Sequence, residues 1–510
     1  MCAMKDIRLW GILILALAVR AVMLFPVFAD VDRAKTPDSE DYELIANVLA
    51  SKGQYSNSHH FPPQKLGSTN FEGPEIIRPP GYPALLAGAV RVSPPAVVHT
   101  EPVWAWRIGG GGRRTPMRTA KVGPPAQEPP APFLKVVLSF QVLIDLHLVM
   151  LTFFLGRSLT GHRVGLLAAL FQAISPLAAA ASCRVLPDSI FAFLLTAGVL
   201  LLIRHFRTGE WWPLLSAGLV TAGASYFQPV GLAFSTLIVL VLLCQPKRVR
   251  RTVAFATVLA ACVAPWFVRN ANAADYRGFS SFAAEGVYWH CAAQLEASTQ
   301  GVPAEDIQMR LIRAEGWMGP MKWYEEEDEM RFFPTRDANA PSNRTPGKLA
   351  DYRWHKAGEL IAAHLWQYPG IHLRGNMAFW LPETNDALEV MGYKLRPERT
   401  MDVLHLQGII AAAKHYFGDN TKATILGCVM LAILAIRYLG VVLCGLWRFR
   451  PRMTAGGWLC LLLVLTAWLL PGPVNSPRFR VPVEPILSVG AAIGWLGLRE
   501  WRRRRRMAGQ

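Results

Sequence analysis

Long apolar runs alternate with short basic segments along the chain, and this pattern predicts a bundle of membrane-spanning helices. A helix needs roughly 17 to 25 apolar residues to cross the hydrocarbon core of a bilayer. Runs of this kind lie at residues 7–29, 133–155, 163–182, 188–204, 211–227, 229–244, 252–270, 421–447, 455–471 and 482–498. We therefore expect an all-α polytopic membrane protein with about ten transmembrane helices.

Arginine and lysine gather in the short loops between these runs and set the predicted orientation. The clusters include Arg204 with Arg207, residues 247–251, and Arg502 to Arg506. Cytoplasmic loops are enriched in Lys and Arg, and placing both termini in the cytoplasm puts every such cluster inside. The apolar stretch 80–98 is then a juxtamembrane helix, because one more crossing would move the later clusters outside. The sequence thus predicts a multi-pass protein of the cell inner (plasma) membrane whose active site is extracytoplasmic.

Composition agrees with this setting, since 52% of the residues are hydrophobic and 17% are charged. The net charge of +17 does not indicate nucleic acid, because the basic residues lie between apolar runs and not along one soluble face. Three parts are predicted: a transmembrane catalytic module at 1–270, an extracytoplasmic region at 271–420, and C-terminal transmembrane helices with a basic tail at 421–510. The first run also fits a signal peptide, although we expect an uncleaved anchor.

The first outer loop, residues 30–132, holds the residues on which the chemical prediction depends. An amphipathic pattern over 39–50 predicts a helix on the membrane surface, with Asp38 at its N-cap or just before it. Capping alone would explain Asp38. The Gly- and Pro-rich segment 99–132 lacks the Gly-Lys-Ser/Thr of a phosphate-binding loop, so it is interpreted as a linker.

A second carboxylate, Asp188, lies at the outer end of a predicted span, on the same side of the membrane as Asp38. A carboxylate at a membrane boundary is costly unless it is hydrated, paired or functional. Capping of the next helix would also explain Asp188, so both interpretations stay open at this point.

The order of the motifs resembles the GT-C class of integral membrane glycosyltransferases, in particular the branch of the protein O-mannosyltransferases and the aminoarabinose transferase of lipid A. The segments that carry the resemblance are Asp38 to Tyr42, Arg78 to Tyr82, Leu155 to Arg163, Arg184 to Asp188, Pro265 to Asn270, and Ser476 to Pro485. The implied fold is a GT-C-type helical bundle with an extracytoplasmic catalytic loop.

This resemblance implies roles for individual residues. Asp38 would be the catalytic carboxylate, and Asp188 would assist it or help to hold a divalent metal ion whose other ligands stay unknown. The residues that would bind the donor phosphate are Arg78, Lys135, Arg269, Arg478 and Arg480. The residues that would contact the acceptor or support the site are Glu40, Asp41, Tyr42 and Tyr82.

The implied reaction moves a hexosyl or pentosyl group from a polyprenyl-phosphate sugar to a hydroxyl of an extracytoplasmic lipid, glycan or protein. An acceptor hydroxyl is a weak nucleophile that needs a base such as a carboxylate, whereas a phosphate leaving group needs positive charge and no proton. A lipid-linked polysaccharide polymerase or ligase, and a non-catalytic transporter or flippase, remain alternatives. A transporter should carry polar residues near the midplane, while the polar clusters here lie at the outer boundary.

Two positions depart from the family pattern, and two charged residues lie inside predicted spans. Ser39 follows Asp38 where the related transferases have Glu, and Gln228 precedes Pro229 where many relatives have a basic residue. Arg20 and Asp145 lie inside predicted spans and are expected to pair with each other. Charged pairs in spans are often functional, but a purely structural pair explains these two residues equally well.

Overall fold

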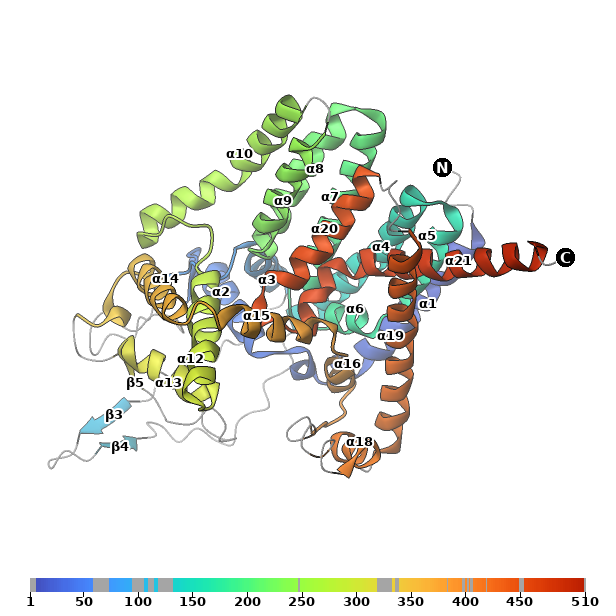
Figure 1. Ribbon diagram of the computed structural model, residues 1–510. Helices are drawn as coiled ribbons and strands as arrows, with labels where there is room; N and C mark the ends of the chain where they lie inside the picture. The colour runs from blue at the N-terminus through green and yellow to red at the C-terminus, as the bar shows by residue number, and fades with distance from the viewer. Residues whose placement is uncertain are drawn as a thin grey trace.

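Helices form almost all of the elements in the computed structural model (Figure 1). The residues described are 6–57, 73–93, 105–108, 114–117, 132–245, 248–318, 333–334, 339–382, 384–396, 400, 403, 407–418, 420–448 and 454–508. The strands are two to four residues long and pair only with one another: β1 (Ser56–Asn57) with β2 (Gly73–Pro74), β3 (Ala105–Ile108) with β4 (Arg114–Met117), and β5 (Trp317–Met318) with β6 (Phe333–Pro334).

Every predicted apolar run forms a helix, which confirms the all-α polytopic fold class. Among the described residues, six helices are long and apolar enough to cross a membrane. They are α1 (Ile7–Ala29), α4 (Pro132–Leu159), α7 (Asp188–Thr208), α10 (Arg248–Ala274), α19 (Thr421–Arg448) and α21 (Glu484–Ala508). The pair α5 (His162–Ala173) and α6 (Pro176–Ser182) is bent by 60° and would add a seventh span.

The three remaining runs form helices of 17 residues or fewer, and two of them are shorter than the predicted runs 229–244 and 455–471. They are α8 (Trp211–Phe227), α9 (Gly231–Leu243) and α20 (Ala455–Leu469). Their lengths of 17, 13 and 15 residues are at or below the roughly 17 residues that a full crossing requires. The predicted number of about ten transmembrane helices is therefore supported for six or seven by length and composition.

The bend between α5 and α6 lies beside a buried ion pair. Pro176 begins α6, and a proline at this point cannot continue the backbone hydrogen bonds of the preceding helix. Arg20 of α1 donates to the carbonyl oxygens of Gln172 and Ala173 at the end of α5, and its Nε lies 2.7 Å from Asp145 Oδ2 of α4. The predicted pairing of Arg20 with Asp145 is confirmed, and both side chains are buried.

The last membrane helix is longer than the predicted run 482–498, because α21 continues through the basic cluster to Ala508. It packs against α19 so closely that a Cβ atom at Gly494 would lie 1.9 Å from the carbonyl oxygen of Gly440. Small residues permit this approach of two helix backbones, as is usual in membrane bundles. Figure 1 shows both chain termini on one side of the molecule, away from helices α12 to α14.

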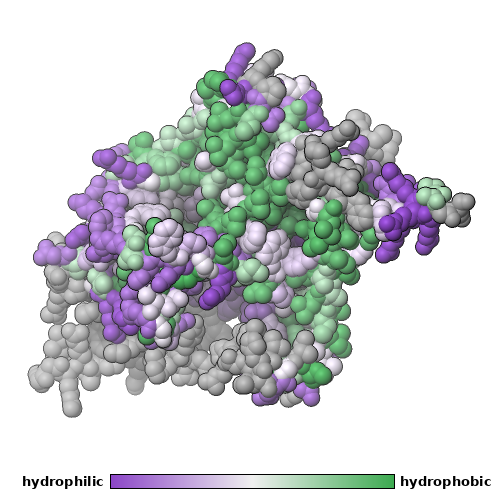
Figure 2. Space-filling view, viewed as in Figure 1, coloured by the Kyte–Doolittle hydropathy of each residue, from purple (hydrophilic) through white to green (hydrophobic). Residues whose placement is uncertain are grey.

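The second predicted outer region, 271–420, consists of short elements in its described part. They are α11 (Phe282–Glu285), the π-helical turn η3 (Gly286–Ala292), α12 (Ala293–Gln300), α13 (Ala304–Ala314), η4 (Pro341–Asn343), α14 (Pro346–Ala363), α15 (Tyr368–Asn376), η5 (Met377–Trp380), α16 (Thr384–Val390) and α18 (Ile409–Phe417). Figure 2 shows hydrophilic residues over α12 to α14 and at the end of α21, and an apolar surface over α8 to α10 and α20.

The described part of the predicted first outer loop forms two helices, α2 (Pro37–Lys52) and α3 (Gly81–Val92), so 39–50 and part of 80–98 are helical as predicted, while their place at the membrane surface stays a prediction. A short 3-10 turn, η2 (Val31–Ala34), connects α1 to α2. Most of the predicted linker 99–132 lies outside the described residues, so that interpretation stays a prediction.

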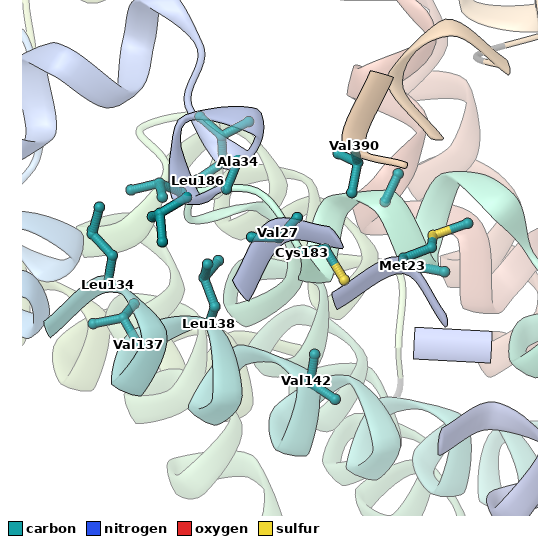
Figure 3. Packing of buried hydrophobic residues seen from close by; sticks show 14 of the residues in the cluster. Met23, Val27, Ala34, Leu134, Val137, Leu138, Val142, Cys183, Leu186 and Val390 are labelled. Atoms are coloured by element: carbon teal, nitrogen blue, oxygen red, sulfur yellow. The ribbon is translucent and has the colours of Figure 1, made fainter. Parts of the chain in front are cut away.

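One apolar core fastens this outer segment to the membrane helices (Figure 3). Met23 and Val27 of α1 contribute to it, as do Leu134 and Leu138 of α4. Cys183, Leu186 and Val390 approach the same cluster from the loop before α7 and from α16. The core therefore lies beneath the point where α2 meets the loop 183–187.

Candidate active site

The N-terminus of α2 carries the first candidate residue, and its capping differs from the prediction. Thr36 is the N-cap residue and Pro37 begins the helix, so Asp38 lies in the first turn and is not the cap. Ser39 takes the role of a capping-box residue, since its Oγ accepts a hydrogen bond from the Thr36 N–H at 2.9 Å. Asp38 is thereby free to point away from the helix backbone, where the positive helix end favours its charge.

Ser39 also joins α2 to the loop that precedes α7. Its hydroxyl donates to the carbonyl oxygen of Val185 at 2.9 Å, and the Val185 N–H donates to the carbonyl oxygen of Ala34 at 2.9 Å. The Ser39 side chain is buried. These bonds hold the start of α2 beside the start of α7, and so they fix Asp38 close to Asp188.

Arg78 stands in a tightly held turn before α3. The carboxylate of Glu75 accepts hydrogen bonds from the backbone N–H groups of Ile77 and Arg78, and the Tyr55 hydroxyl donates to the Arg78 carbonyl oxygen at 2.8 Å. Gly81 follows the two prolines, and a Cβ atom there would lie 2.6 Å from the backbone oxygen of Tyr226 in α8. The Arg-Pro-Pro-Gly sequence thus positions the Arg78 side chain through its backbone.

Four charged side chains from distant parts of the sequence meet at this point. Arg78 Nη2 lies 2.7 Å from Asp38 Oδ1, and Arg478 Nη1 lies 2.5 Å from Asp38 Oδ2. Arg478 comes from the 3-10 segment η7 (Pro477–Val483), and its Nε lies 3.0 Å from Asp188 Oδ2. The structure therefore brings together Asp38, Asp188, Arg78 and Arg478, four of the residues predicted from the sequence.

The electrostatics of the cluster depend on these pairs. Burial alone would raise the pKa of Asp38, but the charges of Arg78 and Arg478 outweigh it and hold the pKa below its ordinary value. The Asp38 side chain keeps an exposed fraction of 32%, so solvent or a substrate can reach it. Asp38 is accordingly an ionised carboxylate that both reaches the surface and is held by two guanidinium groups.

The four supporting candidates take different positions. Asp41 Oδ2 accepts from Arg78 Nη2 at 2.9 Å, so Asp41 belongs to the cluster, whereas Glu40 is exposed. Tyr42 lies under the Arg78 guanidinium, 5.1 Å from its carbon to the ring centre, and burial raises the pKa of Tyr42 to about 12. Tyr82 stacks edge-on against Tyr42 and donates its hydroxyl proton to Gln141 Oε1 at 2.6 Å.

Three predicted phosphate-binding residues are held elsewhere. Arg480 is buried with 1% exposure, and its guanidinium binds Glu484 and the carbonyl oxygen of Phe379. Arg269 donates to the carbonyl oxygens of Glu75 and Tyr55, so it supports the backbone near the Arg78 turn. Lys135 lies over the ring of Phe28 at 5.9 Å.

The predicted role of Arg480 in donor-phosphate binding stays a prediction, and its guanidinium is paired inside the helical bundle. Glu484 also pairs with Arg437 of α19 at 2.5 Å, and this pair adds to the buried ionic contacts around Arg480. Arg478 and Arg480 are two residues apart in the 3-10 segment η7, which has about three residues per turn, so their side chains leave it on different sides.

Two further residues near the site were given no role from the sequence. Phe282, the first residue of α11, lies with its ring centre 5.6 Å from the Arg78 guanidinium carbon and contacts the site from the region 271–420. Arg184 pairs with Asp386 and Glu389 of α16 at 2.9 and 3.0 Å, which ties the loop 183–187 to that region. Phe282 lies outside every motif, and Arg184 stood in one without an assigned role.

A metal ion would need more ligands than the described residues supply. No group of three or more His, Cys, Asp or Glu side chains in the described part of the chain could hold one. Asp38 and Asp188 approach each other, but the guanidinium of Arg478 lies between them. The divalent metal ion implied by the family resemblance does not fit this arrangement.

Comparisons with known proteins support the resemblance over part of the chain. Residues 134–268 match the family model described as dolichyl-phosphate-mannose-protein mannosyltransferase, which confirms the predicted likeness to the protein O-mannosyltransferases in that segment. A comparison of the sequence with curated proteins finds no match.

Solved structures with a similar arrangement of helices include two membrane enzymes. The archaeal oligosaccharyltransferase AglB from Archaeoglobus fulgidus, in complex with an inhibitory peptide and a dolichol-phosphate, has a TM-score of 0.47 at 11% identity. This match covers 98% of the chain and 51% of AglB, so the chain spans about half the length of that protein. ArnT from Cupriavidus metallidurans bound to undecaprenyl phosphate has a TM-score of 0.35 at 12% identity, covering 95% of the chain and 77% of ArnT.

Proposed function

We propose that this protein is a membrane glycosyltransferase that moves one sugar from a polyprenyl-phosphate donor to an acceptor hydroxyl on the extracytoplasmic side. The observation that carries the proposal is the position of Asp38, which is partly exposed between Arg78 and Arg478 at the start of α2. The family match over residues 134–268 supports the reaction class. The inner membrane, the side of the active site and the choice between hexosyl and pentosyl donors belong to the same proposal.

The site has the groups that such a transfer requires. The acceptor oxygen forms a bond to the anomeric carbon of the sugar, and its proton moves to a carboxylate oxygen of Asp38. The bond between the anomeric carbon and the phosphate oxygen breaks, and its electron pair stays on the phosphate. Arg78 and Arg478 stabilise that charge, so the polyprenyl phosphate leaves without a proton.

Donor binding also prepares Asp38 for its role as base. Asp38, Asp41 and Asp188 together outnumber the guanidinium groups of Arg78 and Arg478, so a bound phosphate competes with these carboxylates for the two guanidinium groups. When Asp38 loses a guanidinium partner, its lowered pKa rises towards the ordinary value. The carboxylate thus becomes a better proton acceptor once the donor is in place.

The exchange of Asp38 for Asn tests the proposal. The amide keeps the size of the side chain and cannot accept the proton, so we expect transfer to fall by a factor of about 100 to 10,000. Transfer is followed with purified full-length protein in nanodiscs, using radiolabelled hexosyl and pentosyl polyprenyl phosphates side by side. Product size separates the transfer of one sugar from polymerisation.

Asp32→Asn is the matched control, because Asp32 is an exposed carboxylate of the same outer segment that pairs only with Lys35 among the described residues. It should transfer at the wild-type rate. Unchanged transfer by the Asp38→Asn protein would remove Asp38 from the mechanism, and use of a nucleotide sugar in place of the lipid donor would overturn the proposed reaction.

A further inference from the structure

Arg478 contacts the carboxylates of both Asp38 and Asp188, and this contact bears on how their negative charge is neutralised. We propose that the guanidinium of Arg478 takes the place of a divalent cation between Asp38 and Asp188, so that transfer requires no metal ion. The link to transfer rests on the proposed function. The contact of Arg478 with Asp38 and Asp188 does not depend on it.

Every oxygen of the two carboxylates already accepts a hydrogen bond. Asp38 uses one oxygen for Arg78 and the other for Arg478, at 2.7 and 2.5 Å. Asp188 uses one oxygen for Arg478 at 3.0 Å and the other for the amide of Gln228 at 3.4 Å. A metal ion could bind these oxygens only by displacing a permanently charged guanidinium group.

The surroundings offer too few ligands to compensate for that displacement. Mg²⁺ and Ca²⁺ take about six or more oxygen ligands, and two monodentate carboxylates leave most of them to water. The hydroxyl of Ser39, the residue next to Asp38, donates to the Val185 carbonyl oxygen and is turned away from the carboxylates. Asp41, the third acidic residue of the cluster, is already bound by Arg78, and no group of three or more His, Cys, Asp or Glu side chains among the described residues could hold a metal ion.

Arg478 performs on these carboxylates what a bound cation would do. It neutralises the repulsion between Asp38 and Asp188, which would otherwise also repel an approaching phosphate. It uses Nε and Nη1 for the carboxylates, and Nη2 has no hydrogen-bond partner among the described residues. One guanidinium group can therefore hold two protein carboxylates and still offer a hydrogen bond to the donor.

Direct Mn²⁺ binding tests the inference without any measurement of transfer. Electron paramagnetic resonance reports free Mn²⁺ during titration of the purified full-length protein. We expect the wild type to bind no Mn²⁺ stoichiometrically up to millimolar concentrations. Removal of the guanidinium in Arg478→Ala exposes the two carboxylates and should create one Mn²⁺ site. The added exchange Asp188→Asn should abolish this new site.

Arg91→Ala is the matched control, because Arg91 is an exposed arginine of α3 that donates to the carbonyl oxygens of Leu49 and Ala50. It should behave as the wild type in the titration. Stoichiometric binding of Mn²⁺ by the wild type, or no gain of binding in folded Arg478→Ala protein, would overturn the inference. If Arg478→Ala does not fold, Arg478→Lys serves instead, since one ammonium cannot span both carboxylates with the same geometry.

Transfer assays then link the contact to the reaction. A chelator should leave wild-type transfer unchanged, while Arg478→Ala should lose about 100- to 1,000-fold and recover part of this with Mn²⁺ or free guanidinium. Wild-type transfer that stops with the chelator and returns with Mn²⁺ would contradict the inference. Absence of transfer from every polyprenyl-phosphate sugar would refute the proposed function, and the Mn²⁺ titration would still decide the role of Arg478.

Discussion

Breaking the buried pair between Arg20 and Asp145 should destabilise the protein without changing the chemistry at the outer surface. Both side chains are almost completely buried, and the guanidinium group also binds the carbonyl oxygens of Gln172 and Ala173 at the bend between α5 and α6. Because arginine does not give up its proton, Asp145→Asn leaves a charge inside the bundle with no acidic partner. Arg20→Met in turn leaves the two carbonyl oxygens without this donor.

The magnitudes follow from these contacts. Loss of one partner of a buried ion pair costs about 3 to 5 kcal/mol, and a buried carbonyl without a donor costs about 1 to 3 kcal/mol. The double variant Arg20→Met/Asp145→Asn has no unpaired charge and retains only the cost of the carbonyl oxygens left without a donor. Adding Arg20→Met to Asp145→Asn should therefore raise stability by about 2 kcal/mol, the difference between the midpoints of these two ranges. Each kcal/mol corresponds to about 2 °C in the melting temperature of a large chain.

Thermal unfolding in nanodiscs, followed by tryptophan fluorescence, measures the four members of this cycle. Asp145→Asn should melt about 6 to 10 °C below the wild type, and the double variant should melt above Asp145→Asn. Transfer per folded molecule should stay near the wild-type value in all of them. A double variant less stable than either single variant would refute the argument, and wild-type melting with lost transfer would instead assign the pair a functional role.

Two further predictions concern the site and its side of the membrane. Burial raises the pKa of Asp38 but the two arginine charges lower it below 3.8, so its stabilising contribution is present above that value and lost as the pH falls through the lower folded pKa. The difference in melting temperature between wild type and Asp38→Asn should be constant from about pH 7 to 5 and shrink below about pH 4. A difference that already shrinks at pH 6 would contradict the lowered pKa of Asp38. In a cysteine-free background, an impermeant thiol reagent applied to intact cells should label a cysteine at Ser51 of α2 and not one at Thr208 at the end of α7, and the reverse pattern would invert the topology.

The helical architecture follows from hydropathy because each span buries its own backbone hydrogen bonds and needs only an apolar run of sufficient length. The run at 7–29 corresponds to α1 at both ends, and the break at Pro176 divides another run into two helices. Capping was less predictable, since Thr36 and Ser39 compete with Asp38 for the same helix end. Short polar side chains in succession make the N-cap ambiguous from sequence.

The candidate site could be predicted in part for a similar reason. Asp38 and Asp188 each stand in the first turn of a helix on the same predicted side, and Arg78 lies in the turn before α3, so proximity was a reasonable expectation. Arg478 lies in the site and Arg480 does not because of the way η7 turns. Phe282 contacts Arg78 from a region without a motif. Such contacts arise from tertiary packing and leave no local pattern.

The sequence distance between Asp38 and Arg478 has a consequence for biosynthesis. The two residues in contact are 440 positions apart, and Arg478 directly precedes the last membrane helix. During synthesis, Asp38 and Asp188 are both made long before this guanidinium group exists. A nascent or truncated chain that ends before Pro477 therefore holds two neighbouring carboxylates without their shared counterion. Synthesis of the η7 segment supplies this counterion, so activity should depend on a chain that extends through Arg478.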